Sequence, residues 1–451
     1  MQQKKFGKLN WWILIVFGLV GQIAWSVENM YFNLFVFDTV APNLEAITLM
    51  VQLSGVMATV ATLLAGVLSD KYGNRRSFIS YGYAIWGVTV ALFGCLSPSL
   101  MQGMFELSLE KAVSVTLVAV VVGDCIMTLF GSTANDACFN AWVTDNTESE
   151  YRGGVEGVLS ILPLAAMLIV AGGFGILVTA IGYQALFIAL GAVISLCGVA
   201  GIFFIKDSPK LTKNGSMKEI FYGFKPSVVK QNKCLYLALL VVLLYGIACQ
   251  VFMPYMIIYM KTYLGFTVVE YSVVFGLAII LGAVVNLYLT KLSDKKDKVL
   301  MLYPAAGIMA AGLIGMYLSN TKNHIADLML FGVAGFVMIT GYILVSALCG
   351  AIVRDNTPKD AVGKFQGVRM VFSVLIPMLV GPMIGNAVNA WRNIPLDDLT
   401  SADVMTTQYI PAPEIFLVGG LVALMMFIVI PLLKKQSKTQ TIQQNTQGEQ
   451  A

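Results

Sequence analysis

The chain has 451 residues, of which 57% are hydrophobic and only 12% are charged. Soluble domains carry about 25% charged residues, so most of this protein's surface cannot face water. The composition therefore excludes a soluble globular protein and predicts an all-α integral membrane protein. The seven cysteines lie in or beside apolar runs without paired spacing, which is typical of small apolar side chains rather than of disulfides or metal ligands.

Twelve apolar runs follow one another along the chain. Each is about 20 residues long or more, which is the length that spans a bilayer as a helix. The first run is too long for a cleaved signal peptide. We therefore expect twelve transmembrane helices, at roughly 11–37, 46–68, 77–96, 112–140, 153–179, 183–205, 233–260, 268–290, 299–319, 326–350, 363–390 and 412–433.

A polar stretch with seven lysines separates the sixth run from the seventh. The seventh of these lysines is Lys233, at the start of the seventh run. We predict that the stretch 206–232 links an N-terminal six-helix half, 1–205, to a C-terminal six-helix half, 233–433. The tail, 434–451, is rich in Gln, Thr and Lys and is predicted to be disordered.

The distribution of basic residues predicts the orientation. Of the 29 Lys and Arg residues, 24 lie in segments on the side of the two termini, and only four lie in segments on the other side. Cytoplasmic segments carry the excess of Lys and Arg in membrane proteins. We therefore expect both termini in the cytoplasm and a multi-pass protein of the plasma membrane.

Two patterns occur once in each half. The charged segment 66–76, Gly-Val-Leu-Ser-Asp-Lys-Tyr-Gly-Asn-Arg-Arg, lies between the second and third runs, and a weaker copy at 291–298 follows 224 residues later. The triplet Asp-Asn-Thr at 145–147 recurs at 355–357, and glycines 153 and 157 recur at the same offset of 210. This shared register predicts two parallel six-helix repeats, a plan in which transporters bind substrate between the halves near the midplane.

The segment 66–76 resembles the loop between the second and third helices of the major facilitator superfamily, and 145–157 resembles that family's junction between the fourth and fifth helices. The resemblance implies a carrier that works by alternating access, with a hairpin that helps to close the cytoplasmic side. The gating residues expected on this basis are Gly66, Asp70, Gly73, Arg75, Arg76, Asp145, Arg152, Asp294 and Asp355.

Simple chemistry suggests what these residues do. Gly73 allows a positive φ in the turn, and Asp70 can accept from backbone donors at a helix N-terminus. Arg75 and Arg76 can pair with acids on the neighbouring loop, of which Asp145 is the obvious candidate. Two plainer alternatives remain: basic residues that only hold the loop inside, and glycines that only let helices pack closely.

Another ion pair is expected at the start of the fifth run. Arg152 lies there, and its charge opposes the helix dipole. A partner carboxylate is therefore expected, with Asp70, Asp145 and Glu156 as local candidates.

Three acidic residues lie inside apolar runs: Glu28 in the first, and Asp124 and Asp136 in the fourth. A carboxylate in hydrocarbon costs several kcal/mol unless it is paired, solvated or protonated, so such groups usually face a cavity. The second half has no acid at the matching positions. We interpret the three as ion-coupling residues on one half, with the alternative of a buried polar cluster that only fixes packing.

Polar and aromatic residues surround these acids in the sequence. Carboxylates and amides beside Trp and Tyr suit a polyhydroxylated ligand, although aromatics near helix ends are often interfacial anchors. The expected solute contacts are Trp25, Glu28, Asn29, Asp124, Thr128, Asn135, Gln250 and Tyr255.

The acids of the first and fourth runs and the pattern Asn135-x-Ala137-x-Phe139 are also similar to the glycoside–pentoside–hexuronide:cation symporters and related sugar carriers. Those symporters carry cation-binding acids in the second helix, whereas the run 46–68 has none. This departure favours proton coupling through Glu28 or Asp124, or no coupling, over a sodium site of that design.

The sequence lacks the features that are typical of several other classes of protein. The chain has one histidine, His324, and none of the motifs of metal hydrolysis, ATP-driven chemistry or acyl transfer, so no enzyme activity, cofactor or metal is expected. A solute sensor would usually carry a signalling domain. An exporter would carry a Gly-Pro-x-x-Gly-Gly kink in the fifth run, which is absent.

We therefore expect a secondary active transporter of a small polar solute, with a sugar or glycoside as the solute and a proton or sodium as the coupling ion. It is expected to act as a monomer in the lipid bilayer, without nucleic-acid partners. A proton-coupled exporter and a sensor that does not transport remain the alternatives.

Overall fold

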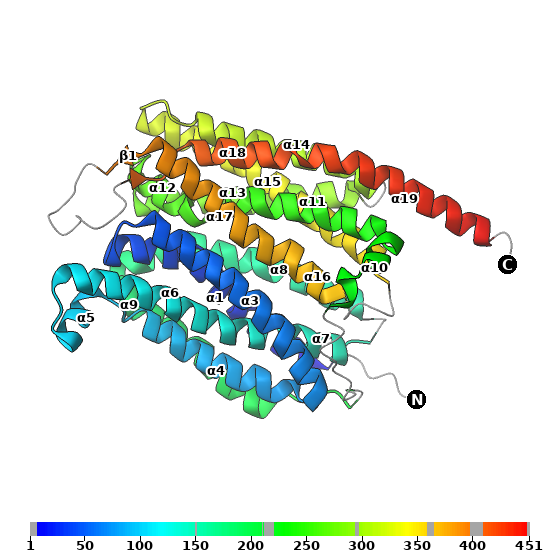
Figure 1. The fold of residues 1–451 in the computed structure, drawn as a ribbon, viewed down its shortest axis with the longest axis horizontal. Coiled ribbons are helices and arrows are strands. Elements are labelled where there is room, and N and C mark those ends of the chain that lie inside the picture. Colours follow the sequence, from blue (N-terminus) through cyan, green and yellow to red (C-terminus); the bar gives the residue numbers. More distant parts are fainter. Residues whose placement is uncertain are drawn as a thin grey trace.

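The computed structural model describes residues 7–148, 151–209, 211, 221–293, 297–358, 365–396 and 409–448. Nearly all of these residues are helical, and the long helices run roughly side by side along one axis (Figure 1). The first half of the chain forms α1 (Lys8–Val27), α2 (Asn33–Phe35), α3 (Leu44–Tyr72), α4 (Arg75–Phe93), α5 (Pro98–Phe105), α6 (Leu109–Gly131), α7 (Asn140–Asn146), α8 (Arg152–Ile169) and α9 (Gly175–Phe204).

The second half of the chain is also almost entirely helical. It forms α10 (Pro226–Gln231), α11 (Lys233–Gln250), α12 (Met256–Thr262), α13 (Val268–Ser293), α14 (Lys298–Leu318), α15 (His324–Asn356), α16 (Gln366–Met370), α17 (Ile376–Arg392), α18 (Glu414–Leu424) and α19 (Met426–Gly448). Its two short strands, β1 (Ile394–Pro395) and β2 (Tyr409–Ile410), pair antiparallel. In the described part of the chain, five π-helical segments interrupt the long helices, at Glu28–Phe32, Val36–Val40, Ser132–Phe139, Val170–Phe174 and Val371–Leu375.

Within the described residues, ten helical segments are long and apolar enough to cross a bilayer, and α4 with α5, bent by 87°, would be an eleventh. One of the ten, Gly154–Phe204, has 51 residues. At 1.5 Å per residue it would measure about 77 Å, more than twice the hydrocarbon thickness of a bilayer. Gly182 interrupts it with φ 80°, where the predicted fifth and sixth spans meet. The all-α membrane fold is thus confirmed, while twelve spans stay a prediction.

The helices of the two halves lie in different parts of the bundle. In Figure 1, α3, α4, α6 and α9 lie below, and α11, α14, α17 and α18 lie above. The closest neighbours pack within a half, such as α4 with α9 and α14 with α15, while α3 contacts α17 across the halves. This grouping is what two six-helix units would give.

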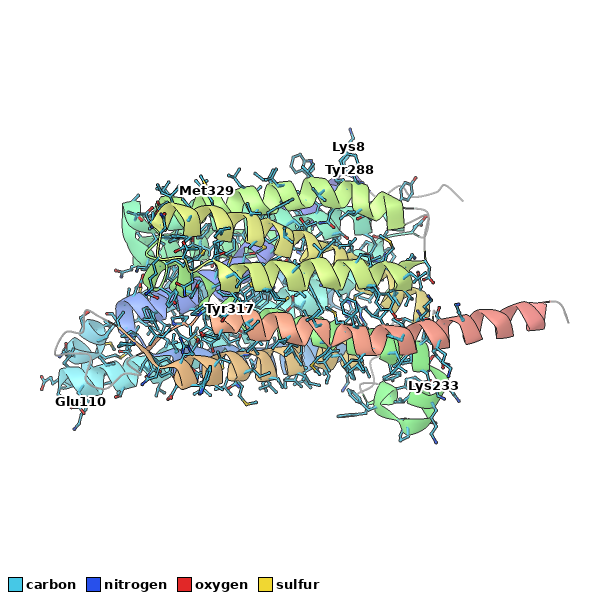
Figure 2. The ribbon with its side chains drawn as sticks, turned by 90° about the horizontal axis from the view of Figure 1, so that it is seen from above. Lys8, Glu110, Lys233, Tyr288, Tyr317 and Met329 are labelled. Atoms are coloured by element: carbon cyan, nitrogen blue, oxygen red, sulfur yellow. The ribbon has the colours of Figure 1, made fainter. Side chains whose placement is uncertain are left out.

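α1 begins and α19 ends at the same end of the bundle (Figure 1). We call it the terminal end, and it also holds the turn between α3 and α4. Glu110 lies at the opposite end, and Lys233 lies toward the terminal end (Figure 2). Segments predicted to lie on different sides of the membrane therefore lie at different ends of the bundle.

Local chemistry sets the turn between α3 and α4. α3 ends at Gly73, which has φ 62° and donates its N–H to the carbonyls of Ser69 and Asp70. Asn74 then caps α4 by accepting from the N–H of Ser77 at 2.9 Å. Glycine adopts this left-handed conformation without strain, so the chain reverses direction within two residues.

Close helix contact occurs elsewhere than predicted. A Cβ on Gly157 or Gly66 would meet no described atom within 4 Å, so the predicted close approach at Gly157 is wrong. Instead, a Cβ on Gly87 of α4 would lie 2.2 Å from the carbonyl oxygen of Gly191 in α9. The sequence contains 42 glycines, and spacing alone does not show which of them touch another backbone.

α19 continues through most of the predicted tail, to Gly448, while the disorder of 434–451 in solution stays a prediction. The helix begins in the apolar run Met426–Leu433, whose packing provides the costly first turns. Lys and Gln are good helix formers, so they extend a helix that already exists.

Topology can be tested at four positions. We expect single cysteines at Asp145 and Asp355 to face the cytoplasm, and single cysteines at Lys111 and His324 to face outside, because the Lys and Arg asymmetry orients the chain. Labelling intact cells with an impermeant thiol reagent in a Cys-free background measures this directly. Labelling of the positions 145 and 355 on opposite sides would rule out two parallel repeats.

Candidate functional site

Two of the predicted acids meet in the core of the first half. Glu28 is 8% exposed and Asp124 is 2% exposed. Asp124 of α6 lies near Glu28. The regular helix of α1 changes to a π-helix at Glu28, and π-helical turns are frequent at functional sites.

Hydroxyl groups from two other helices bind Glu28. Ser54 of α3 and Thr128 of α6 donate to Glu28 Oε1 at 3.0 and 3.1 Å, and their own oxygens are 2.9 Å apart. Each hydroxyl has only one hydrogen, so two hydrogens serve three short contacts between oxygens. A further hydrogen or a cation would satisfy the third contact.

Both carboxylates keep an oxygen without a partner. Glu28 Oε2 and Asp124 Oδ1 are buried and accept no hydrogen bond from the part of the chain that the structure describes. Among the ion pairs between described residues, none involves either acid. A buried charge without a partner is costly, so the pair is suited to hold a proton or another cation.

Asp136 belongs to a second polar group, about three turns beyond Asp124 in the same helical span. Ser132 donates to its Oδ2 at 3.0 Å, and Asn135 donates to its Oδ1 at 3.3 Å. The buried Tyr83 in turn donates to Asn135 Oδ1 at 2.8 Å. Asn135 is thus held between Tyr83 and Asp136, and its predicted contact with a solute stays a prediction.

An aromatic wall borders these groups. The Trp25 and Trp86 rings are 5.0 Å apart, and Trp86 was not among the predicted residues. A Cβ on Gly131 would lie 2.7 Å from the Trp86 ring, so only glycine leaves room for it there. The Asn29 amide donates to the carbonyl of Trp25 at 2.8 Å, so it stabilises the turn that carries Glu28.

The structure does not bring Tyr255 into the acidic cluster. This fully buried residue lies within hydrogen-bond distance of Thr48 in the other half, at 2.6 Å, and donates to the carbonyl of Pro382 at 2.9 Å. A Cβ on Gly381 would lie 2.4 Å from Cβ of Gln250, which shows how closely these two positions pack. Both predicted residues of the second half thus lie at helix contacts.

A charge network surrounds the α3–α4 turn at the terminal end. Arg75 is 5% exposed and donates to Asp145 Oδ2 at 3.2 Å, as predicted, and to Ser69 and Asp70. The predicted role of Asp70 at a helix N-terminus is wrong. Asp207 Oδ1 instead accepts from the backbone N–H groups of Arg75 and Arg76, both at 2.9 Å.

The second half has an ion pair in the matching place. Lys298 at the start of α14 pairs with Asp355 at 2.6 Å, as Arg75 at the start of α4 pairs with Asp145. Among the described residues, an exposed ion pair between Glu156 and Arg354, at 3.8 Å, joins the two halves at this end. Asp294 lies outside the described residues, and so does the side chain of Arg152.

Tighter contacts join the halves at the opposite end. Lys261 of α12 pairs with Asp38 at 2.7 Å, and Tyr183 donates to the other oxygen of Asp38 at 2.8 Å. The Gln52 amide donates to the carbonyl of Leu379 at 2.7 Å. Asp38 and Lys261 were not among the predicted residues, because 223 residues separate them and no local pattern connects them.

The ion pair between Asp38 and Lys261 should stabilise the closed opposite end. We expect Lys261→Met to raise the thiol accessibility of a cysteine placed at Gln52 by up to about fivefold, since partly exposed ion pairs contribute roughly 0.2–1 kcal/mol. The measurement is the labelling rate from the opposite side. Lys111→Met serves as a control, and the exchange of Asp38 with Lys261 should restore the slow rate. An unchanged rate in Lys261→Met would show that the pair does not hold this end closed.

The comparisons with known proteins agree with this architecture. The sequence model of the Major Facilitator Superfamily matches residues 13–382. The fold is similar to that of a mutant of the nucleoside transporter NupG, with a TM-score of 0.64, 10% identity and coverage of 94% of this chain and 99% of that chain. No curated protein matches the sequence.

Two bacterial structures are similar to the same extent. A homologue of the iron transporter ferroportin gives a TM-score of 0.60 at 14% identity and covers 94% of this chain and 98% of that chain. A homologue of the human lysosomal transporter Spinster gives 0.59 at 11% identity and covers 94% and 95%. At these identities the likeness concerns the fold alone.

Proposed function

Because the chain belongs to the major facilitator superfamily, we propose that it is a secondary active transporter that couples the movement of a small polar solute to that of a cation. It is a multi-pass membrane transporter. A sugar or glycoside is the proposed solute, a proton or sodium the proposed coupling ion, and the plasma membrane the proposed location, where the chain would act as a monomer.

The observation that carries the coupling proposal is the buried pair Glu28 and Asp124. Each keeps an oxygen that accepts nothing from the described residues, and the hydroxyls of Ser54 and Thr128 lie beside them. Such a site has unused acceptors and lacks a fixed positive charge among its described neighbours. It therefore suits a cation that binds and leaves during each cycle.

The contacts between halves support alternating access. Among the polar contacts between described residues of the two halves, two hydrogen bonds and an ion pair of 2.6–2.7 Å lie at the opposite end, whereas the ion pair at the terminal end is exposed and 3.8 Å long. This asymmetry is expected of a carrier closed on one side. We propose that 1–205 and 233–433 move against each other about the central site, and that Arg75, Asp145 and Asp355 take part in gating the terminal end.

Solute contacts are proposed from both halves. Trp25 would provide an aromatic face in the first half. Tyr245 and Tyr342, whose rings are 5.3 Å apart, would provide the facing surface in the second half. Aromatic faces beside carboxylates and amides suit the C–H and hydroxyl groups of a sugar.

Uptake into proteoliposomes tests the function. The panel should contain labelled sugars and glycosides, with a nucleoside and ferrous iron added because similar structures belong to transporters of those classes. Imposed pH and sodium gradients identify the coupling ion. Concentrative uptake of a sugar supports the proposal, efflux driven by an inward proton gradient would identify an exporter, and binding without flux would identify a sensor.

A further inference from the structure

A cavity lies on the first half at the terminal end, and its lining contains no residue of the acidic cluster. It has a volume of about 500 Å³ and lies between the α3–α4 turn and the end of α9. Its lining includes Tyr72, Arg76, Ser77, Tyr81 and Asp207. Nothing in the proposed transport cycle uses this space.

An apolar strip leads along the outer surface to this cavity. In α4, Ile85, Val88 and Leu92 are 41–62% exposed, and in the adjacent α9, Leu196, Val199 and Phe203 are 46–72% exposed. Tyr72 and Tyr81, which line the cavity, are 59% and 58% exposed. Exposed apolar side chains of a membrane protein face lipid tails, and exposed tyrosines concentrate where the tails meet the head groups. The cavity therefore lies at the level of lipid head groups.

The cavity carries both signs of charge. Arg76 is exposed and donates one hydrogen bond to the carbonyl of Ile202, which leaves other guanidinium N–H groups. Asp207 uses Oδ1 to cap the N-terminus of α4, which leaves Oδ2. Ser80 also lines the cavity, and its buried hydroxyl has no hydrogen-bond partner among the described residues.

We propose that this cavity binds a zwitterionic phospholipid whose head group carries a primary amine. The phosphate would bind Arg76 and the neighbouring Ser77, the ammonium group would donate to Asp207 Oδ2, and the acyl chains would lie along the α4–α9 strip. A quaternary amine has no N–H to donate to Asp207, and an anionic head group has no positive charge to offer it. The arrangement thus selects among head groups as well as binding lipid in general.

Native mass spectrometry of the purified full chain tests the proposal. The protein is titrated with dioleoyl lipids that carry ethanolamine, choline or glycerol head groups. We expect the ethanolamine lipid to bind about tenfold more tightly than the other two. Arg76→Gln and Asp207→Asn should each lower that affinity by about tenfold, because each change removes one charged partner of the head group and tenfold in affinity corresponds to about 1.4 kcal/mol. Asn still accepts from the backbone of α4, so Asp207→Asn keeps the cap.

A matched control and two competitors complete the test. Lys71→Gln removes a charge from the same turn outside the cavity lining and should not change the affinity. Equal binding of the three lipids by the wild-type protein would overturn the proposal, even if a variant failed to fold. Competition by inorganic phosphate or by glycerophosphoethanolamine, which has no acyl chains, would assign the cavity to a soluble ligand instead.

Discussion

Glu28→Gln and Asp124→Asn are each expected to reduce accumulation of solute against its gradient by about tenfold or more. Both changes keep the shape of the side chain and its hydrogen-bonding oxygen but remove the charge. The transfer of an isolated carboxylate to the centre of a bilayer costs roughly 2.5–3.5 kcal/mol, so a site that keeps two of them together has a use for their charge. Without that charge the site cannot bind the coupling cation.

The measurement is uptake into proteoliposomes under an imposed cation gradient, with binding of the solute measured separately. Glu110→Gln is the matched control, because Glu110 is an exposed acid at the opposite end of the protein. Accumulation at the wild-type level in both variants, with normal amounts of folded protein, would reduce Glu28 and Asp124 to a polar packing cluster.

Gly73→Val is expected to lower the turnover rate by about 5–30-fold while it leaves solute affinity nearly unchanged. Gly73 has φ 62°, and a residue with a Cβ loses roughly 1–2 kcal/mol in this conformation. Arg75 lies two residues after Gly73, so the strain would displace Arg75 from Asp145. Because this network lies at the terminal end, the solute site should not change.

Gly73→Asn provides the control, because Asn tolerates the left-handed conformation. It should retain most of the turnover. Turnover rates come from exchange across proteoliposomes, and affinities come from equilibrium binding to the purified protein. A large loss of affinity in folded Gly73→Val would mean that the turn takes part in binding as well as in gating.

Much of this arrangement follows from local sequence patterns. The apolar runs predict the helices, and the segment 66–76 predicts a tight charged turn and the ion pair between Arg75 and Asp145. The buried acids are visible because a carboxylate is rare within an apolar run. Each of these signals needs only a short stretch of sequence or a repeat of it.

Contacts between distant segments carry no such signal. Asp207 caps a helix 131–132 residues before it, and Lys261 pairs with an acid 223 residues away. Ser54 looks like any other small polar residue until α3 is placed beside Glu28. The same limit explains the error at Gly157, since a glycine spacing does not say whether another helix is near.

The contact of Tyr255 with Thr48 shows how the opposite end could open many times without damage. The carbonyl of Leu44 lies 2.6 Å from the Thr48 hydroxyl, and the carbonyl of Pro382 lies 2.9 Å from the Tyr255 hydroxyl. Each hydroxyl has one hydrogen, so while the two hydroxyls bind each other only one of these carbonyls accepts a hydrogen bond. When the halves part, each hydroxyl therefore keeps a hydrogen-bond acceptor that travels with it. Neither hydroxyl is left without a hydrogen-bond partner, so breaking the contact between Tyr255 and Thr48 costs little free energy. The contact can form again because both side chains are already held in place.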